Sequence, residues 1–107
     1  MIMLILACLD VKVQMSVGEE VSWKLGSKTF GPYNEIEIGS VSEEVCIQRG
    51  THKLVCKDTA GDGWHAGYIE IDNKRYCDNF TSGNSMTIEV TMVTIGDKGN
   101  AMYKSTV

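Results

Sequence analysis

The residues with the most chemical potential lie between two cysteines, in residues 56 to 77, CKDTAGDGWHAGYIEIDNKRYC. Asp58, Asp62, Trp64 and His65 crowd together there among several glycines. Carboxylates on a loop that glycines allow to bend tightly are the kind of ligand that Ca²⁺ prefers. The segment raises three chemical hypotheses, which are metal binding, sugar binding and catalysis, beside the simpler interpretation as a turn.

Calcium binding is the first hypothesis, with Asp58 and Asp62 as ligands and Glu70 or Asp78 completing the set. An EF-hand register that begins at Asp58 places Asp62 correctly, but it puts Ile69 where a bidentate glutamate is required. The loop is therefore not an EF-hand, and a looser Ca²⁺ site remains open. The alternative is that both aspartates form Asx turns and the glycines supply left-handed backbone, without any ion.

Sugar binding is the second hypothesis, with Trp64, His65 and Tyr68 as the ligand-binding residues. An aromatic ring beside hydrogen-bonding groups on a loop of a β-sandwich can serve as a platform for a sugar. The competing interpretation is that Trp64 folds back over the end of the core, which is where a tryptophan more often lies in a small domain.

Catalysis is the third hypothesis, and the sequence gives it little support. His52 and His65 are the two histidines of the chain, and no nucleophile motif such as G-x-S-x-G accompanies them. A second carboxylate pair at a spacing that suits a cleft is also missing from the sequence. We therefore predict a non-catalytic protein.

The four cysteines predict two disulfides and an oxidising compartment, because small secreted domains use such bridges. No C-x₂₋₄-C pair is present, which argues against zinc. Of the three connectivities, Cys56–Cys77 is the local choice and leaves Cys8–Cys46. The sequon Asn79-Phe80-Thr81 also fits secretion and makes Asn79 a candidate glycosylation site.

Length and charge limit the domain organisation and the classes of partner. A chain of 107 residues is one domain, residues 1 to 107. Its formal charge of −4, with scattered Lys and Arg, argues against nucleic acid and against anionic membrane as partners. Residues 1 to 7 are apolar but too short for a membrane span, so we expect a buried N-terminal strand there.

Alternation of apolar and polar residues dominates the chain. Val11, Val13 and Met15 alternate with polar residues, and residues 86 to 93 form the longest such run. No segment keeps a period of 3.6 residues, and turn residues recur between the runs. The pattern predicts an all-β fold, an antiparallel β-sandwich of jelly-roll or CUB-like type with about eight short strands. Residues 94 to 107 are expected to form a polar tail with a short strand at 101 to 103.

Several stretches occur in an order that resembles a small secreted module, frequent in predicted extracellular proteins of algae and other protists. They are GEEVSWKLG at residues 18 to 26, GPY at 31 to 33, the C-x-D-x-x-G-D-G-W-H signature at 56 to 65, and YCDNFTSG at 76 to 83. The resemblance covers about residues 8 to 93. It implies a β-sandwich, an extracellular location and a non-catalytic role, and it brings no settled ligand.

Together these patterns predict an extracellular structural or adhesion module that acts through protein–protein contacts. The apolar strand at residues 1 to 7 could be accepted by a neighbouring subunit as an added strand, which would make the protein a self-assembling subunit of a surface filament. The alternative function is a calcium-assisted, lectin-like carbohydrate-binding module.

Overall fold

The computed structural model describes residues 6–16, 18–36, 38–48, 50–95 and 100–105. A short 3₁₀ helix, η1 (Gly18–Glu20), precedes the second strand. The strands are β1 (Leu6–Met15), β2 (Val21–Leu25), β3 (Lys28–Phe30), β4 (Gly39–Gln48), β5 (Gly50–Asp58), β6 (Tyr68–Ile71), β7 (Lys74–Tyr76), β8 (Ser85–Ile95) and β9 (Asn100–Ser105). Of the expected N-terminal strand, residues 6 and 7 begin β1, and residues 1 to 5 lie outside the described residues.

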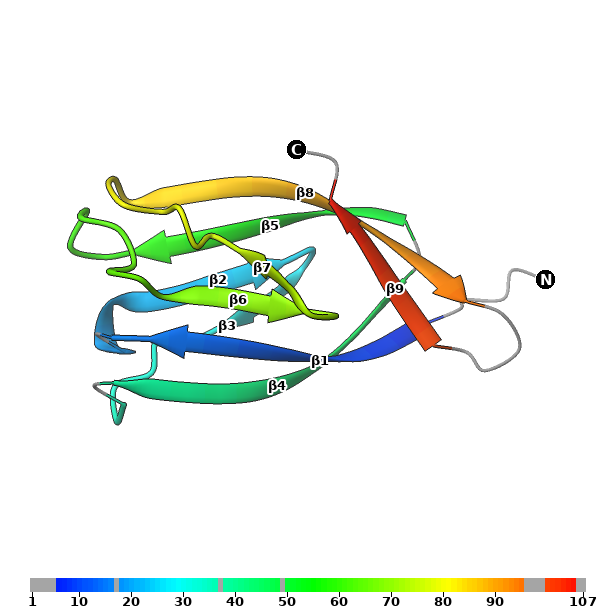
Figure 1. Cartoon of the computed structure of the whole chain (residues 1–107), viewed down its shortest axis with the longest axis horizontal. Coiled ribbons are helices and arrows are strands. Elements are labelled where there is room, and N and C mark those ends of the chain that lie inside the picture. Colours follow the sequence, from blue (N-terminus) through cyan, green and yellow to red (C-terminus); the bar gives the residue numbers. More distant parts are fainter. Residues whose placement is uncertain (1–5, 17, 37, 49, 96–99, 106–107) are drawn as a thin grey trace.

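The strands form two antiparallel sheets, so the predicted all-β sandwich is confirmed. One sheet has the order β4-β1-β6-β7, and the other has the order β3-β2-β5-β8-β9. Most strands run along the long axis of the molecule. Strand β9 runs obliquely to the others and contacts β1 (Figure 1). The described part of the chain holds no helix long and apolar enough to cross a membrane.

The core lies between the sheets and follows from the alternation of side chains along each strand. On β1 the inward side chains of Val11, Val13 and Met15 are buried, and on β2 the same holds for Trp23 and Leu25. These are the positions that period-2 alternation selects from the sequence.

Strands β4 and β9 are longer than the alternation of apolar and polar residues predicts. The buried apolar residues of β4, Val45 and Ile47, lie in its second half, but β4 pairs with β1 along all of its 10 residues. The first part of β4, GSVSEE, is polar because it lies at the edge of its sheet. In the expected polar tail, β9 includes the predicted strand at residues 101 to 103 and pairs with β8.

Both predicted disulfides are present, and they have different places in the fold. Cys56 of β5 is bonded to Cys77, which follows β7, so this bridge joins the two sheets. Cys8 and Cys46 are bonded directly opposite each other on β1 and β4, within one sheet. Two bridges in a chain of this size indicate an oxidising environment.

A chain of hydrogen bonds connects Trp23 with the β4 strand. The Trp23 indole Nε1 donates to Tyr33 Oη at 2.9 Å, and Tyr33 Oη donates to Glu43 Oε2 at 3.2 Å. Burial raises the pKa of Tyr33 to about 12, and the Glu43 carboxylate contributes in the same direction. Tyr33 is therefore held in its neutral form well above the pH at which a free tyrosine ionises.

Limited reduction of the native protein should open the Cys8–Cys46 bridge first. Thiol attack requires access to a sulfur atom. Cys8 is exposed, whereas Cys56 and Cys77 are buried at 0% and 1% relative exposure. After mild reductant and alkylation, peptide mapping should find the label on Cys8 and Cys46 while Cys56 and Cys77 stay paired. Equal labelling of all four would contradict this placement.

The Tyr33→Phe variant should lose part of the alkaline sensitivity of the wild type. The folded-state pKa of Tyr33 is raised to about 12, so its contribution to stability is fully present below pH ~10 and is lost as the pH rises through 12. The phenyl ring of the variant cannot ionise, so denaturant unfolding between pH 9 and 12 should show a shallower fall for the variant. If the free energy of unfolding falls equally with pH in the wild type and in the variant, Tyr33 ionises as easily in the folded protein as in the unfolded chain.

Candidate functional site

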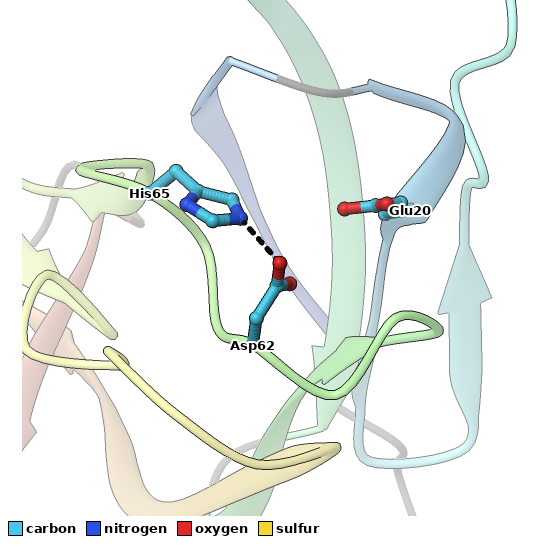
Figure 2. A group of neighbouring side chains, drawn as sticks. All are labelled: Glu20, Asp62 and His65. Carbon is cyan, nitrogen blue, oxygen red and sulfur yellow. Dashed lines mark ion pairs between the residues drawn. The ribbon is translucent and has the colours of Figure 1, made fainter.

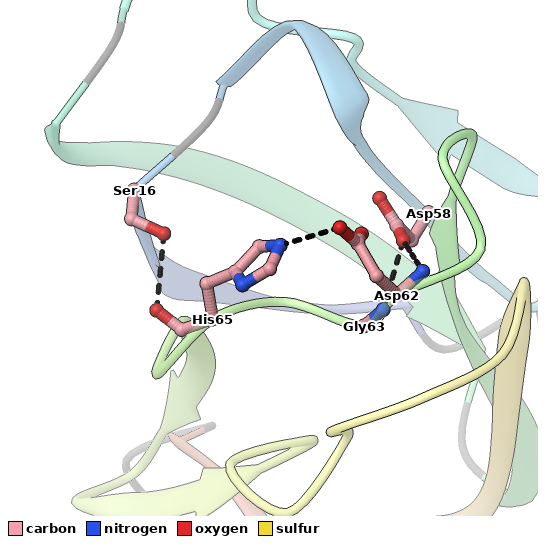
Figure 3. Close-up of polar contacts among 5 residues, drawn as sticks. All are labelled: Ser16, Asp58, Asp62, Gly63 and His65. Atoms are coloured by element: carbon pink, nitrogen blue, oxygen red, sulfur yellow. Dashed lines mark hydrogen bonds and ion pairs between the residues drawn. The ribbon is translucent and has the colours of Figure 1, made fainter.

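The carboxyl group of Asp58 organises the loop that follows β5. Leu54, Cys56 and Asp58 alternate inward on this strand, so Asp58 occupies a core-facing position with 2% relative exposure. Its Oδ2 accepts the backbone N–H groups of Asp62 at 2.7 Å and Gly63 at 2.8 Å (Figure 3). This is the turn chemistry that the sequence pattern of Asp and Gly predicts.

Backbone hydrogen bonds attach the loop to the segment between β7 and β8. Trp64 N donates to Phe80 O at 2.9 Å, and Gly83 N donates to Gly61 O at 3.0 Å. At the start of the loop, Asp58 N donates to Asn84 O at 2.8 Å. The loop is thus held on both sides, by its own aspartate and by a neighbouring segment.

Gly63 is required by a close approach of two backbones. It has a φ of 82°, and a Cβ placed on it would lie 2.5 Å from Phe80 O. Gly83 also has a positive φ, of 93°, but a Cβ there meets nothing within 4 Å. The signature glycine therefore serves packing as well as backbone conformation.

The expected aromatic platform for a sugar is not formed. Trp64 is a core residue with 1% relative exposure, and its Nε1 donates to Lys57 O at 2.8 Å. The ring completes the end of the core beside Phe80, which argues against the predicted role of Trp64 as a ligand-binding residue. Tyr68 is half-buried, and Arg75 covers its ring with Cζ 4.0 Å from the centroid.

His65 lies on the exposed side of the loop. Its Nε2 is 3.0 Å from Asp62 Oδ2, and both side chains are about half exposed, at 45% and 54% (Figure 2). The backbone oxygen of His65 accepts a hydrogen bond from Ser16 Oγ at 3.0 Å, which ties the loop to the end of β1 (Figure 3). His65 therefore fixes the orientation of the Asp62 carboxylate.

Glu20 is the site residue that sequence reasoning missed. Val21, its neighbour, pairs with Asp58 in the β2–β5 ladder, and Thr59 N donates to Glu20 O at 3.3 Å. Glu20, Asp62 and His65 consequently offer three ligand atoms that all lie within 4.8 Å of one another. The acidic pair Glu19-Glu20 is visible in the sequence, but only the strand register brings it to the loop.

The pKa directions reflect the gathering of negative charge. Burial raises the pKa of Glu20, and the carboxylates of Asp58 and Asp62 raise it further. The pKa of Asp62 is lowered, first by hydrogen bonding with the Asp58 side chain and then by His65. Within this acidic group the pKa of Glu20 is therefore raised and that of Asp62 is lowered.

The other predicted metal ligands lie apart from this cluster. Glu70 is on β6, where its Oε2 is 3.7 Å from Arg75 Nε and its backbone is opposite Lys12. Asp78 is exposed in the turn after β7 and is not a member of the candidate ligand group. Asn79, beside it, is exposed as a glycosylation site requires.

A second surface feature lies where β4 begins. Among the residues whose burial the structure describes (8–16, 18–36, 38–48 and 50–91), Ile38 is the one large apolar side chain that is exposed, at 80%. It borders an open hollow of about 740 Å³. The hollow is lined by Asn34, Glu35, Ile36, Ile38, Gly39 and Ser40. Within the described part of the chain, β4 is also an edge strand.

No family model, curated protein or solved structure matched this chain.

Gly63→Ala should destabilise the protein more than Gly83→Ala. Both substitutions strain a left-handed backbone, at a cost of about 1 kcal/mol each. Only the new methyl group at Gly63 overlaps a backbone atom, Phe80 O, so we expect an additional loss of about 2 kcal/mol. Chemical denaturation of the two variants gives the difference directly, and equal losses would contradict the close approach.

Proposed function

We propose that this protein is an extracellular, non-catalytic structural or adhesion module that acts through protein–protein contacts, including contacts between copies of the chain. The observation that carries the proposal is the exposed Ile38 beside an open hollow at the start of edge strand β4. Two disulfides and the exposed Asn79 sequon support secretion.

The β4 edge has the properties of a strand acceptor. An edge strand presents backbone N–H and C=O groups that an added strand can pair with. β4 is 10 residues long, and it carries neither lysine nor proline, the residues that often protect an edge. Glu43 and Glu44 lie next to each other in its middle, so two β4 strands paired about that point would repel.

The favoured occupant of the edge is the N-terminal segment of a second copy. Residues 1 to 5, MIMLI, are uncharged and apolar at every position, so an extended form needs cover on both faces. An apolar strand added to β4 would avoid the repulsion between paired glutamates, and Ile38 would offer it an apolar neighbour. Head-to-tail donation of this kind produces a filament when the rotation between successive copies does not close into a ring.

A carbohydrate-binding role has less support, because the burial of Trp64 and the stacking of Arg75 on Tyr68 remove the aromatic platform that it needs.

Ile38→Asp should weaken self-association. The change places a charge where an apolar contact is proposed, and we expect the association constant to fall at least about tenfold, since a lost apolar contact of this size is worth ~1.5–3 kcal/mol. Sedimentation velocity over a concentration series measures the effect. Thr87→Asp is the matched control, because Thr87 is exposed on β8, an interior strand of the other sheet.

Removal of residues 1 to 5 identifies the occupant of the edge. A truncated chain that keeps its thermal unfolding transition but no longer associates supports strand donation. If the wild type stays monomeric at high concentration, or if both aspartate variants associate like the wild type, the proposed role of the β4 edge is overturned.

A further inference from the structure

The Asp58 carboxyl group is buried and only half satisfied. Its Oδ2 accepts two backbone N–H groups, whereas Oδ1 is buried and has no hydrogen-bond partner among the described residues. An unpaired buried carboxylate oxygen costs free energy, and native proteins usually provide it with a donor or a cation. Figure 3 shows this second oxygen directed away from the two amides, on the side of the Asp62 carboxylate.

A second carboxylate and a third converge on the same place. The backbone N–H of Asp62 donates to Asp58 Oδ2, which brings the Asp62 side chain to this place, and Glu20 approaches from η1 (Figure 2). Carboxylates that converge on one place repel each other, which favours a proton or a cation between them. Among the described ion pairs, the partner of this group is the exposed imidazole of His65, which carries a charge only when it is protonated.

The spacing of the ligand atoms suits one ion. Oxygen atoms bound to Ca²⁺ lie about 2.4 Å from it, so two ligands on opposite sides are about 4.8 Å apart. Ligand atoms of Glu20 and Asp62 lie within 4.8 Å of each other, and the unpartnered Oδ1 of Asp58 lies on the side of the Asp62 carboxylate (Figure 3). We propose that Glu20, Asp58 and Asp62 form a Ca²⁺ site that joins η1 to the loop after β5.

The chemistry of the donors favours a hard cation. Three carboxylates and water form the kind of oxygen shell that Ca²⁺ accepts in flexible geometry. In this assignment His65 stays outside the shell and positions Asp62 through the 3.0 Å contact between Nε2 and Oδ2. A transition ion such as Zn²⁺ would instead take the imidazole nitrogen as a ligand.

The site shares no residue with the edge contact proposed above, so substitutions can test the two proposals separately. Calorimetric titration of the EDTA-treated full chain with CaCl₂ should give one site with a Kd of about 10⁻⁴ to 10⁻³ M, the range of extracellular modules. The thermal midpoint should rise with Ca²⁺ concentration, because the ion binds the folded state.

Glu20→Gln and Asp62→Asn should each weaken Ca²⁺ binding at least about tenfold, since each removes one charged ligand. Glu19→Gln is the matched control, because it removes the same charge from the exposed neighbouring residue, and its Kd should stay within about twofold of the wild type. His65→Ala should keep most of the Ca²⁺ affinity.

Three results would overturn the assignment. One is the absence of Ca²⁺ binding at 10 mM, and another is binding that survives both Glu20→Gln and Asp62→Asn. The third is a preference for Zn²⁺ over Ca²⁺ that His65→Ala abolishes. Asp58 is not substituted in this test, because its Oδ2 also holds the turn and a variant could fail to fold.

Discussion

Asp58 stands where the alternation of β5 calls for an apolar side chain, two residues beyond Cys56 on the same buried face. Its carboxyl group lies where the core ends and the loop begins. One carboxyl oxygen accepts hydrogen bonds from two backbone N–H groups that the turn would otherwise leave unpaired. The packing of Trp64 and the approach of Gly63 to Phe80 follow from that fixed turn. The same burial leaves its second oxygen in need of a partner, so one constraint shapes both the fold and the site.

The two disulfides support this arrangement in different ways. Cys56–Cys77 lies between the sheets and anchors the segment that pairs with the loop, so it preserves the site directly. Cys8–Cys46 fastens β1 to the edge strand β4 over a sequence separation of 38 residues. Such a link restricts the unfolded chain and keeps the register of β4 fixed, while the described strands leave its outer edge unpaired.

The sequence predicts those parts of the protein that local patterns determine. Val11, Val13 and Met15 were recognisable as one buried face, and the pairing of Cys56 with Cys77 followed from proximity. Trp64 could not be assigned from its type alone, because the same residue suits a sugar platform and a core. The role of Glu20 as a site residue could not be predicted from the sequence. Its place beside Asp58 depends on the register of β2 with β5, which is a long-range property. The first half of β4 was missed because an edge strand needs no apolar alternation when it pairs with β1 on one side only.

The 3₁₀ helix η1 connects the acidic cluster to the segment beside the hollow. At one end Glu20 faces the carboxylates of the loop, and at the other end Gly18 N donates to Ile36 O at 3.0 Å while Gly18 O accepts from Tyr33 N at 2.9 Å. A Cβ on Gly18 would lie 2.0 Å from Ile36 O, so the two backbones are packed too closely for any side chain at this position. An ion that fixes Glu20 would therefore also restrain the segment that carries Ile38. If the ion changes the affinity of the β4 edge for its partner, thermodynamic linkage requires the partner to change the affinity for the ion by the same factor.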